Sequence, residues 1–491
     1  MTSSSRGGLS KREFLKAGVG GVGILGAGRF LTASAFGYSD RLYDEKFRPQ
    51  FHFSAMKNWI NDPNGLVYYK GEYHLFFQHN PFGIEWGNMT WGHAVSSDLM
   101  HWKQLAHAIE PDELGTIFSG SAVIDWNNTS GFQSGDENVM VAFYTSAGEF
   151  AKPVPKPFTQ SIAYSNDRGR TWVKYEKNPI VENIGDDDNR DPKVIWHEAT
   201  GYWVMVLFLD SEDAEFAILR SKDLKSWQIT QKLRLGGTRE CPDMFELAVD
   251  GNEDEKKWVF WGWDSGYLVG SFDGERFSPE QDHCRAAIGH YYSAQAYSDI
   301  PASDGRRIQI AWMRAYGKFR GTPFNQQMSI PCELKLRRLS EGLRICLTPV
   351  KEVELVREFG YSHKPTVVTE FDKNVLADVK SELLEVQAEI GVMDAKEFGF
   401  DLRGNELLYD VTEKKMTCCD LETQVKPVEG VIKLHILVDR ASIEVFVNDG
   451  ERSMFKCSPL DTENLSLGFF ARGGNVKLER INIWQLRSVW R

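Results

Sequence analysis

Several features that mark other protein classes are scarce in this sequence of 491 residues. Lys and Arg (57) are outnumbered by Asp and Glu (69), and a net charge of −12 argues against nucleic acid or an anionic membrane as partner, because both attract basic surfaces. The seven cysteines are irregularly spaced, which excludes a regular disulfide framework and paired Cys-x-x-Cys metal ligands. No stretch after the N-terminal segment has the about 20 apolar residues of a membrane-spanning helix, so the mature protein is expected to have no stable membrane span.

Helical periodicity is also nearly absent. After Gly65, short apolar, aromatic and β-branched runs alternate with Gly, Asn and Asp, which is typical of β-strands joined by turns. The runs are Leu66–Tyr69, Tyr73–Gln78, Val139–Thr145, Ser161–Tyr164, Val194–Trp196, Trp203–Phe208, Phe216–Leu219, Trp258–Trp263 and Ile308–Met313. Lys70-Gly71 and Thr200-Gly201 are expected at hairpin tips. The pattern predicts an all-β fold.

Residues 1–35 are predicted to be an export signal. Lys11-Arg12 precede a weakly apolar, glycine-rich run, and Ala33-Ser34-Ala35 has the small-x-small form of a cleavage site. The segment resembles a twin-arginine signal in which Lys11 replaces the first arginine, so the twin-arginine and the general route both stay open. The mature protein is expected to begin near Phe36 and to act in the periplasm or outside the cell.

An Asp followed four or five residues later by an aromatic residue recurs through the predicted β region. The pairs are Asp98 with Trp102, Asp167 with Trp172, Asp223 with Trp227 and Asp273 with Phe277. Repeated four-stranded units of this length are typical of propeller blades, and chance recurrence of a common turn is the alternative. We predict a propeller over residues 45–345, a charged, aromatic-poor linker over 346–372 and a β-sandwich over 373–491.

Three acidic residues of the predicted propeller share one local context, a functional neighbour and a proline that follows. They are Asp62 in Asn61-Asp62-Pro63, Asp191 in Arg190-Asp191-Pro192 and Glu240 in Glu240-Cys241-Pro242-Asp243. Taken alone, Asp62 is expected where a strand meets a Pro-Asn-Gly turn, and an Asp that caps its own turn is the simpler interpretation. In a propeller, however, inner strand ends converge on one axis, so the three carboxylates are expected to share a pocket.

Such a pocket suits glycoside hydrolysis, which needs an ionised carboxylate as nucleophile and a carboxylic acid that protonates the leaving oxygen. Hydrogen-bond donors favour the ionised carboxylate, whereas burial and neighbouring negative charge favour the protonated acid. Arg190 and Arg239 oppose the second effect, and which influence prevails stays open. Amide, hydroxyl and aromatic side chains that suit a sugar ring occur in Gln78–Pro81, Glu85–Asn88, Phe118–Ser121 and Trp312-Met313.

Seven stretches, in order, resemble glycoside hydrolase family 32, which includes invertases, levanases and exo-inulinases. They are Trp59–Gly65, Phe77–Pro81, Glu85–His93, Phe118–Ser121, Arg190–Pro192, Glu240–Asp243 and Asp439–Phe446. Two departures are mild: Ile60 stands where Met is frequent, and Tyr291–Gln295 replaces a commoner Phe-Tyr-Ala-Ala-Gln.

The resemblance implies a five-bladed β-propeller followed by a C-terminal β-sandwich, and a retaining mechanism on terminal β-fructofuranosyl units. It implies Asp62 as nucleophile, Glu240 as general acid/base and Asp191 as transition-state stabiliser. The implied substrate-binding residues are Asn61, Gln78, Trp86, Phe118, Ser119, Arg190, Asp243 and Trp312. No cofactor and no metal is expected, so Asp186-Asp187-Asp188 is interpreted as a solvated loop rather than a calcium site.

We therefore predict an exported β-fructofuranosidase that acts on levan, inulin or sucrose. The alternatives are a non-catalytic fructan-binding protein on the same scaffold and a fructosyltransferase in which a sugar acceptor replaces water. The preferred substrate, exo or endo attack, and a monomeric or dimeric state stay open.

Overall fold

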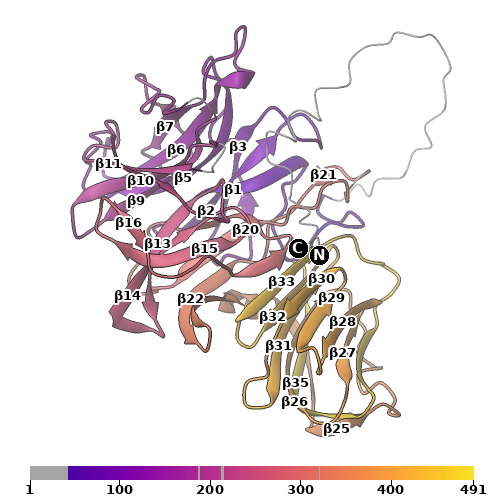
Figure 1. Ribbon diagram of the computed structural model, residues 1–491. Helices are drawn as coiled ribbons and strands as arrows, with labels where there is room; N and C mark the ends of the chain where they lie inside the picture. Colours follow the sequence, from indigo (N-terminus) through magenta and orange to yellow (C-terminus); the bar gives the residue numbers. More distant parts are fainter. Residues whose placement is uncertain (1–41, 186–187, 212–214, 320, 491) are drawn as a thin grey trace, which may run out of the picture. The chain divides into compact units, whose positions relative to one another are not determined.

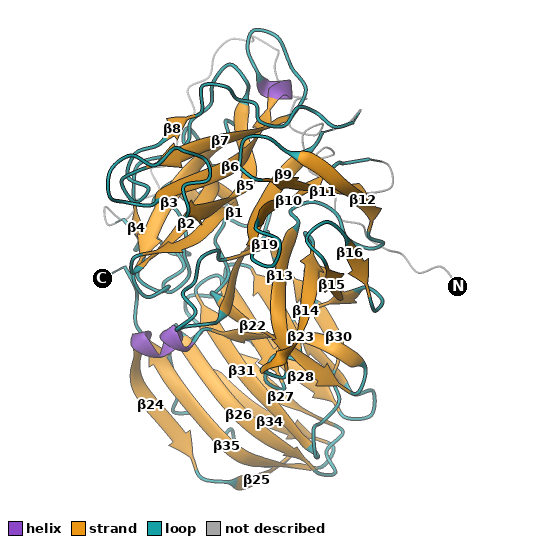
Figure 2. Cartoon of the chain, turned by 90° about the vertical axis from the view of Figure 1, so that its left-hand side faces the viewer, coloured by secondary structure: helices purple, strands orange, loops and turns teal. Residues whose placement is uncertain are grey.

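The computed structural model describes residues 42–185, 188–211, 215–319 and 321–490. The expected export signal, residues 1–35, lies outside this part. Strands dominate the described residues, whose helical segments are two short 3₁₀ helices, η1 (Gly148–Phe150) and η2 (Lys351–Val356), drawn in purple in Figure 2. None of the helices in this part is long and apolar enough to cross a membrane.

The described residues up to Pro349 form successive antiparallel meanders (Figure 1). The first contains β1 (Asn58–Tyr69), β2 (Glu72–Asn80), β3 (Thr90–Ser96) and β4 (Lys103–Gln104), with β21 (Phe324–Asn325) parallel to β1. The second contains β5 (Thr116–Asp125), β6 (Val139–Ala147), β7 (Thr159–Ser165) and β8 (Val173–Lys174). The third contains β9 (Arg190–His197), β10 (Tyr202–Phe208), β11 (Glu215–Ser221) and β12 (Gln228–Arg234).

The next sheet has nine strands and contains two meanders. One consists of β13 (Asp243–Val249), β14 (Asn252–Trp261), β15 (Gly266–Phe272) and β16 (Phe277–Pro279), with β17 (Cys284–Arg285) beside β15. The other consists of β19 (Tyr292–Ala296), β20 (Arg307–Trp312), β22 (Cys332–Leu339) and β23 (Gly342–Pro349). A single parallel pair, Val249 with Leu336, joins them. The pairing therefore yields four sheets, and the number of five blades stays a prediction.

The first strands of these meanders lie around one axis. β1 contacts β5, β5 contacts β9, β9 contacts β13, and β19 contacts β1. The backbone N–H of Ala296 at the end of β19 donates to Asp243 Oδ2 at the start of β13 (2.5 Å), which closes the ring. Meanders arranged radially with their first strands innermost form a β-propeller, so this prediction is confirmed.

Strand β10 shows why so many runs in this region are apolar at every position. Met205 belongs to the same core cluster as Phe143 of β6, whereas Val206 belongs to the cluster that contains Phe260 of β14. Successive side chains of a strand point to opposite faces, and both faces of β10 are covered by neighbouring meanders. A strand buried on both sides has a continuous hydrophobic sequence instead of an alternating one.

The repeated Asp and aromatic residue form the same turn between the third and fourth strands of four meanders. Asp98, Asp223 and Asp273 each accept hydrogen bonds through Oδ1 from the backbone N–H groups two and three residues later. The indoles of Trp102, Trp172 and Trp227 each donate to the carbonyl three residues earlier. The repeat thus has a structural cause, and chance recurrence is wrong.

The stretch from Asp62 to Gly65 lies inside β1, so the expected strand end and turn are wrong. The pairing of β1 with β2 instead shifts register between Ile60 and Pro63 and again between Asn64 and Val67. Gly65 has a φ of 55°, and a Cβ there would lie 2.6 Å from the Phe76 ring. Such bulges change the direction of a side chain without ending the strand, which aims Asp62 toward the axis.

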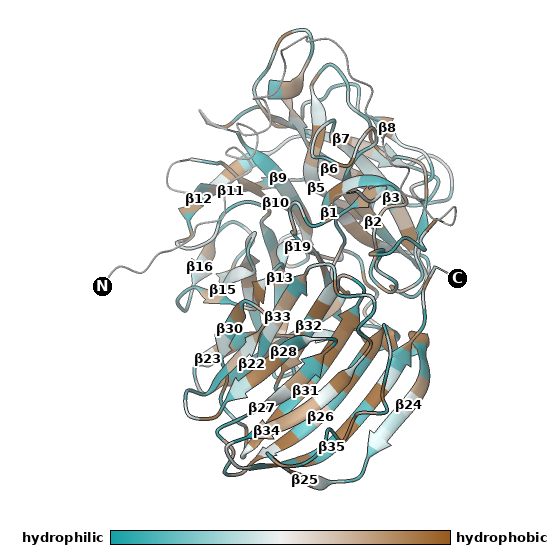
Figure 3. Cartoon of the chain, turned by 90° about the vertical axis from the view of Figure 1, so that its right-hand side faces the viewer, coloured by the Kyte–Doolittle hydropathy of each residue, from teal (hydrophilic) through white to brown (hydrophobic). Residues whose placement is uncertain are grey.

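The described residues after Pro349, together with β18, form two sheets whose strands are antiparallel except for the parallel pair of β18 and β33. The first contains β18 (Ala287–Gly289), β33 (Arg452–Cys457), β32 (Ser442–Val447), β31 (Val431–Asp439), β26 (Leu384–Val392), β35 (Asn475–Leu486), β24 (Arg357–His363) and β25 (Thr366–Thr369). The second contains β30 (Leu421–Gln424), β29 (Lys415–Cys418), β28 (Asn405–Asp410), β27 (Glu397–Leu402) and β34 (Leu467–Arg472). Hydrophobic and polar bands alternate along β26, β31 and β35 in Figure 3. Both sheets contribute to one core cluster, which confirms the β-sandwich.

Residues 346–372, expected as a linker, contain the end of β23, the helix η2 and the strands β24 and β25. Both β24 and β25 pair with β35, so they extend the first sheet of the sandwich. The low aromatic content that suggested a linker reflects strands that are largely exposed, since most residues of β24 have at least one-third of their surface open to solvent.

A buried ion cluster connects the segment before β1 to the sandwich. His52 Nδ1 lies 2.8 Å from Asp439 Oδ2, and Nε2 lies 3.1 Å from Glu444 Oε2. Burial lowers the pKa of His52, but the Glu444 charge and the hydrogen bonds to both carboxylates outweigh it and raise the pKa to about 9. The imidazolium form therefore holds two buried carboxylates at neutral pH.

Candidate active site

Three carboxylates lie at the inner strands of the propeller: Asp62 in β1, Asp191 in β9 and Glu240 just before β13. Their residues are only 1%, 3% and 1% exposed. Asp62 and Asp191 line one pocket together with Ser119, Cys241 and Ser293. Asp62 and Asp191, which are 129 positions apart (191 − 62), thus meet because each belongs to a strand next to the axis.

Asp62 is held by a hydroxyl from the neighbouring meander. Ser119 Oγ in β5 donates to Asp62 Oδ2 at 2.5 Å, and Cys241 Sγ lies 3.8 Å from the same oxygen. Asn61, one residue earlier, accepts a hydrogen bond from the Trp59 indole at 2.8 Å. A short hydrogen bond to a carboxylate favours its ionised form, which a nucleophile requires.

Gln78 lies on the strand next to Asp62. Its neighbours Phe77 and His79 pair with Pro63 and Ile60, so Gln78 is opposite the bulge that contains Asp62. Its side chain is buried. The structure therefore brings this predicted substrate-binding residue beside the first carboxylate.

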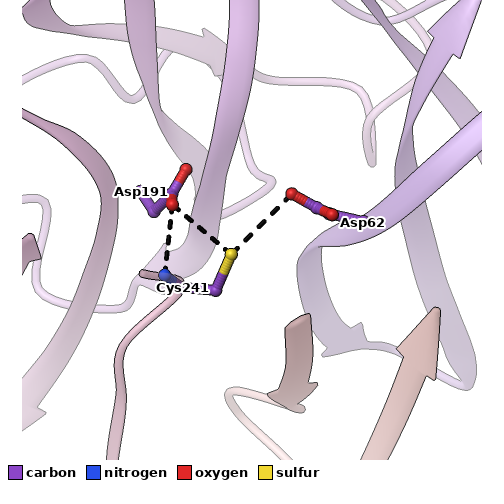
Figure 4. Close-up of side chains that lie close together, drawn as sticks. All are labelled: Asp62, Asp191 and Cys241. Atoms are coloured by element: carbon purple, nitrogen blue, oxygen red, sulfur yellow. Dashed lines mark hydrogen bonds between the residues drawn. The ribbon is translucent and has the colours of Figure 1, made fainter. Parts of the chain in front are cut away.

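Asp191 is fixed by groups from two other meanders, and Figure 4 shows one of them, Cys241, beside Asp191 and Asp62. Its backbone N–H donates to Thr145 Oγ1 at 3.0 Å, and the backbone N–H of Cys241 donates to Asp191 Oδ2 at 3.1 Å. Cys241 Sγ lies 3.3 Å from Asp191 Oδ2, so the thiol faces both aspartates. The second aspartate is thereby oriented toward the first.

The backbone around the carboxylates is strained. Asp191, Glu240, Cys241 and Ser293 have φ values of 63°, 29°, 45° and 49°. For residues other than glycine, this left-handed region costs roughly 1–3 kcal/mol each and persists where the surrounding structure enforces it. Such strain is enriched at functional sites, which agrees with a catalytic role for this pocket.

Arg190 links Glu240 to the rest of the site. Its Nη2 donates to Glu240 Oε1 at 2.8 Å, and its Nε lies 3.9 Å from Asp191 Oδ2. The Tyr292 hydroxyl donates to Glu240 Oε2 at 3.2 Å. Burial lowers the pKa of Arg190, but the charges of the surrounding carboxylates outweigh it and raise the pKa above its ordinary value. A permanent cation therefore stands between the carboxylates.

Aromatic rings surround the carboxylates. Trp312 in β20 meets Trp59 edge to face at 6.0 Å and Tyr292 at 5.6 Å. Tyr316 stacks on Trp59 at 5.8 Å and is 39% exposed. Aromatic faces of this kind accept the C–H face of a sugar ring.

Two further predicted binding residues lie on the side of the second meander. Trp86, in the loop between β2 and β3, meets Phe118 edge to face at 5.9 Å. Phe118 is buried and directly precedes Ser119, whose hydroxyl binds Asp62. Phe118 is thus one residue from a side chain that binds Asp62, and Trp86 packs against Phe118.

Asp243 is held at the start of β13 by two backbone N–H groups and a lysine. Its Oδ2 accepts from the Ala296 backbone (2.5 Å), its Oδ1 accepts from the Met244 backbone (2.8 Å), and Lys193 Nζ lies 3.2 Å from Oδ1. These contacts tie β13 to β19 and β9. Of the predicted site residues, Asp62, Ser119 and Asp191 line the small pocket, and the substrate-binding role of Asp243 stays a prediction, as do those of the other predicted binding residues.

Cys241, Tyr292 and Asp210 are among the contacting residues that were not predicted. Cys241 directly follows Glu240, so its adjacency to a candidate acid could have identified it. Tyr292 was noted only as part of a departure from the family pattern. Asp210 has no sequence signal, because only the pairing of β10 with β9 brings it to Arg190 (2.6 Å).

Asp62, Asp191 and Cys241 also form a cluster that could hold a metal ion, since one ligand atom from each lies within 4.8 Å of the others. The same atoms are engaged by hydrogen-bonding groups, with Ser119 on Asp62 and Ser293 Oγ 3.0 Å from the thiol. The expectation that no metal is needed stays a prediction. Of the acidic run interpreted as a solvated loop, residues 186 and 187 lie outside the described part.

Comparisons with known proteins agree with this architecture. Residues 52–349 match the glycosyl hydrolases family 32 N-terminal domain, and residues 352–485 match the family 32 C-terminal domain. A levanase of Bacillus subtilis is 42% identical, over 94% of this chain and 73% of its own length. An extracellular exo-inulinase of Aspergillus awamori is 32% identical, over 91% of this chain and 96% of its own length.

Solved structures give the same result. The crystal structure of exo-inulinase from Aspergillus awamori superposes with a TM-score of 0.81 at 29% identity, covering 91% of this chain and 100% of the other. A fructofuranosidase variant from Schwanniomyces occidentalis, complexed with fructosylnystose, also has a TM-score of 0.81, at 26% identity, with coverage of 92% and 100%. The chain is therefore a glycoside hydrolase that belongs to family 32.

Proposed function

We propose that the protein is an exported β-fructofuranosidase that releases terminal fructosyl units from levan, inulin or sucrose. The levanase and exo-inulinase relatives support the substrate class, and the extracellular exo-inulinase supports export. One observation carries the proposal: the carboxylates of Asp62 and Glu240 are both buried beside the propeller axis, and each is held by hydrogen-bond donors, Ser119 on Asp62 and Arg190 with Tyr292 on Glu240.

The two roles follow the family resemblance and not these contacts, because the Arg190 cation and the Tyr292 hydroxyl both favour the ionised form of Glu240. Asp62, held ionised by Ser119, attacks the anomeric carbon, and Glu240 donates its proton to the glycosidic oxygen, which leaves with the rest of the substrate. Glu240 then takes a proton from water, whose oxygen attacks the anomeric carbon and breaks its bond to Asp62. Fructose leaves, and both carboxyl groups return to their starting forms.

The neighbouring residues have supporting roles. Asp191, oriented by the Cys241 backbone, accepts hydrogen bonds from ring hydroxyls and stabilises the positive charge that develops on the sugar. Burial and the Glu240 charge raise the pKa of Tyr292 well above its ordinary value, so its hydroxyl stays a neutral donor to Glu240. The fructosyl ring contacts Asn61, Gln78, Trp86, Phe118, Ser119, Arg190 and Trp312.

Two isosteric variants test this proposal. Asp62→Asn and Glu240→Gln should each lower the release of fructose from sucrose, levan and inulin by on the order of 10³-fold or more, because each removes a group that acts on the reacting atoms. Asp420→Asn, which neutralises an exposed carboxylate of the sandwich, is the matched control and should retain turnover. Circular dichroism and thermal unfolding establish that the variants fold.

Near-normal turnover in either variant would overturn the assignment. Absence of fructose release by the wild type from all three substrates would favour a fructan-binding protein. If transfer to sugar predominates over hydrolysis, oligosaccharides will exceed free fructose at high sucrose concentration.

A further inference from the structure

A fourth carboxylate, Asp210, lies against the group that holds Glu240. Strand β10 runs antiparallel to β9, and Phe208 at its end pairs with Arg190 at the start of β9. The chain therefore returns to the axis two residues later. Asp210 is only 8% exposed and has a φ of 41°, so its position is fixed by the fold and not by solvent.

Arg190 bridges this carboxylate and Glu240. Its Nη1 donates to Asp210 Oδ2 at 2.6 Å, while its Nη2 donates to Glu240 Oε1 at 2.8 Å. On the outer side, Arg239 Nη2 lies 3.6 Å from Asp210 Oδ1 and is partly exposed. One buried guanidinium thus divides its charge between two carboxylates, and a second cation at the rim competes for Asp210.

The sharing of Arg190 between Asp210 and Glu240 affects the proton that Glu240 donates in the first step. A cation 2.8 Å from a carboxylate favours the ionised form, which opposes the proton that Glu240 has to carry into the first step. A second carboxylate on the same guanidinium reduces that effect. Burial raises the pKa of Asp210, and the Arg190 charge opposes the rise, as expected for a carboxylate that depends on this cation.

We propose that Asp210 is a positioning residue that offsets the charge of Arg190 and thereby keeps Glu240 protonated at the pH of the reaction. The inference rests on the proposed function, because it assumes that Glu240 is the proton donor. Asp210 itself does not touch the substrate, and it acts only through Arg190.

Other polar and charged side chains also surround Glu240 and Arg190 and influence the protonation of Glu240. Those that face Glu240 or its partners are Arg190, Arg239, Tyr292, Arg314, Asp62 and Asp191. The negative charge of Asp188 also acts on Asp210 and raises its pKa. Among these groups, Asp210 and Arg190 share a hydrogen bond of 2.6 Å, so a change at Asp210 acts first on the guanidinium.

Asp210→Asn is the direct test, because the amide oxygen can still accept from Arg190 Nη1 while the charge is lost. The alkaline limb of the kcat/KM profile for sucrose should move to lower pH by about one unit, since a full positive charge then acts on Glu240. The acid limb should move less. Asp210→Glu, which restores the charge, should return the alkaline limb to higher pH.

Arg239→Gln supplies a second test with the opposite sign. It removes the cation that competes for Asp210, so more of the negative charge acts on Arg190 and the alkaline limb should move to higher pH. This variant alters a partly exposed side chain and remains informative even if Asp210→Asn fails to fold.

The pH profiles of the variants test the role of Asp210, whereas turnover by the wild type tests the proposed function. If wild-type protein turns over sucrose but neither variant moves the alkaline limb, the role of Asp210 is overturned and the proposed function stands. A loss of kcat in Asp210→Asn without a change in the limb also overturns it, because it indicates a structural role only. If the wild type hydrolyses no fructoside, the proposed function fails first.

Discussion

Replacement of His52 is predicted to remove a loss of unfolding free energy that the wild type shows as the pH rises from about 6.5 to about 9. His52 is buried between Asp439 and Glu444, and its pKa is raised from 6.5 to about 9. A group whose pKa is higher in the folded state contributes stability that is fully present below its unfolded pKa. That contribution is lost as pH rises through about 9.

The size of the effect follows from the two pKa values. Each tenfold difference in proton affinity is worth about 1.4 kcal/mol, so a rise from 6.5 to about 9 corresponds to about 3 kcal/mol of unfolding free energy. Asp439 acts in the other direction: burial raises its pKa, but the hydrogen bond and charge of His52 outweigh this and lower it. Its contribution is present above its unfolded pKa and is lost in acid.

Urea unfolding of the wild type and His52→Gln at pH 6, 8 and 10 provides the assay. At pH 6 the variant should be less stable, because two buried carboxylates lose their cation, at a cost of roughly 3–5 kcal/mol. The difference from the wild type should shrink by about 3 kcal/mol by pH 10. His101→Gln is the matched control: His101 lies 2.8 Å from Asp98 but is 39% exposed, so its loss should cost less than about 1 kcal/mol. A difference between wild type and His52→Gln that is constant from pH 6 to 10 would show that the pKa of His52 is not raised in the folded protein.

Two further substitutions probe packing and substrate binding. A Cβ at Gly120 would lie 1.9 Å from the Phe143 carbonyl oxygen, so Gly120→Ala should lower the unfolding free energy by about 3 kcal/mol in thermal denaturation. Gly236→Ala is the control and should be nearly neutral, because a Cβ there would meet nothing within 4 Å. Equal stability of the two variants would contradict this packing account. Tyr316→Ala removes an exposed ring stacked on Trp59 and should raise KM for inulin and levan by roughly 3–10-fold with little change in kcat. Tyr361→Ala, in the sandwich, is the control and should leave both constants unchanged. An unchanged KM in initial-rate measurements would exclude Tyr316 from the substrate path.

Much of the fold was predictable because the local signals agree with the tertiary structure. The run Trp203–Phe208 forms all of β10 except its first residue, Tyr202, and the Asp–aromatic repeat marks the same turn in successive meanders. The sandwich strands show the alternation expected where one face is buried. These features depend on neighbours close in sequence, which a pattern can report.

The remaining features depend on contacts that sequence does not encode locally. The residues around Asp62 read as a turn because Pro, Asn and Gly favour turns, but the pairing of β1 with β2 absorbs them as bulges inside a strand. Asp210 reaches Arg190 only through the pairing of β10 with β9. The carboxylates of the site and Arg190 were identified from their motifs, whereas the fourth acid that Arg190 binds, Asp210, was not.

The identity of the nucleophile can be measured directly by mass spectrometry. Glu240→Gln incubated with an activated aryl β-fructofuranoside, whose leaving group needs no proton, should accumulate a covalent fructosyl enzyme. After digestion, the added fructosyl mass should be on the peptide that contains Asp62, and Asp62→Asn should acquire none. Attachment at another residue, or turnover of the aryl fructoside by Asp62→Asn at the wild-type rate, would contradict the assignment of Asp62 as the nucleophile.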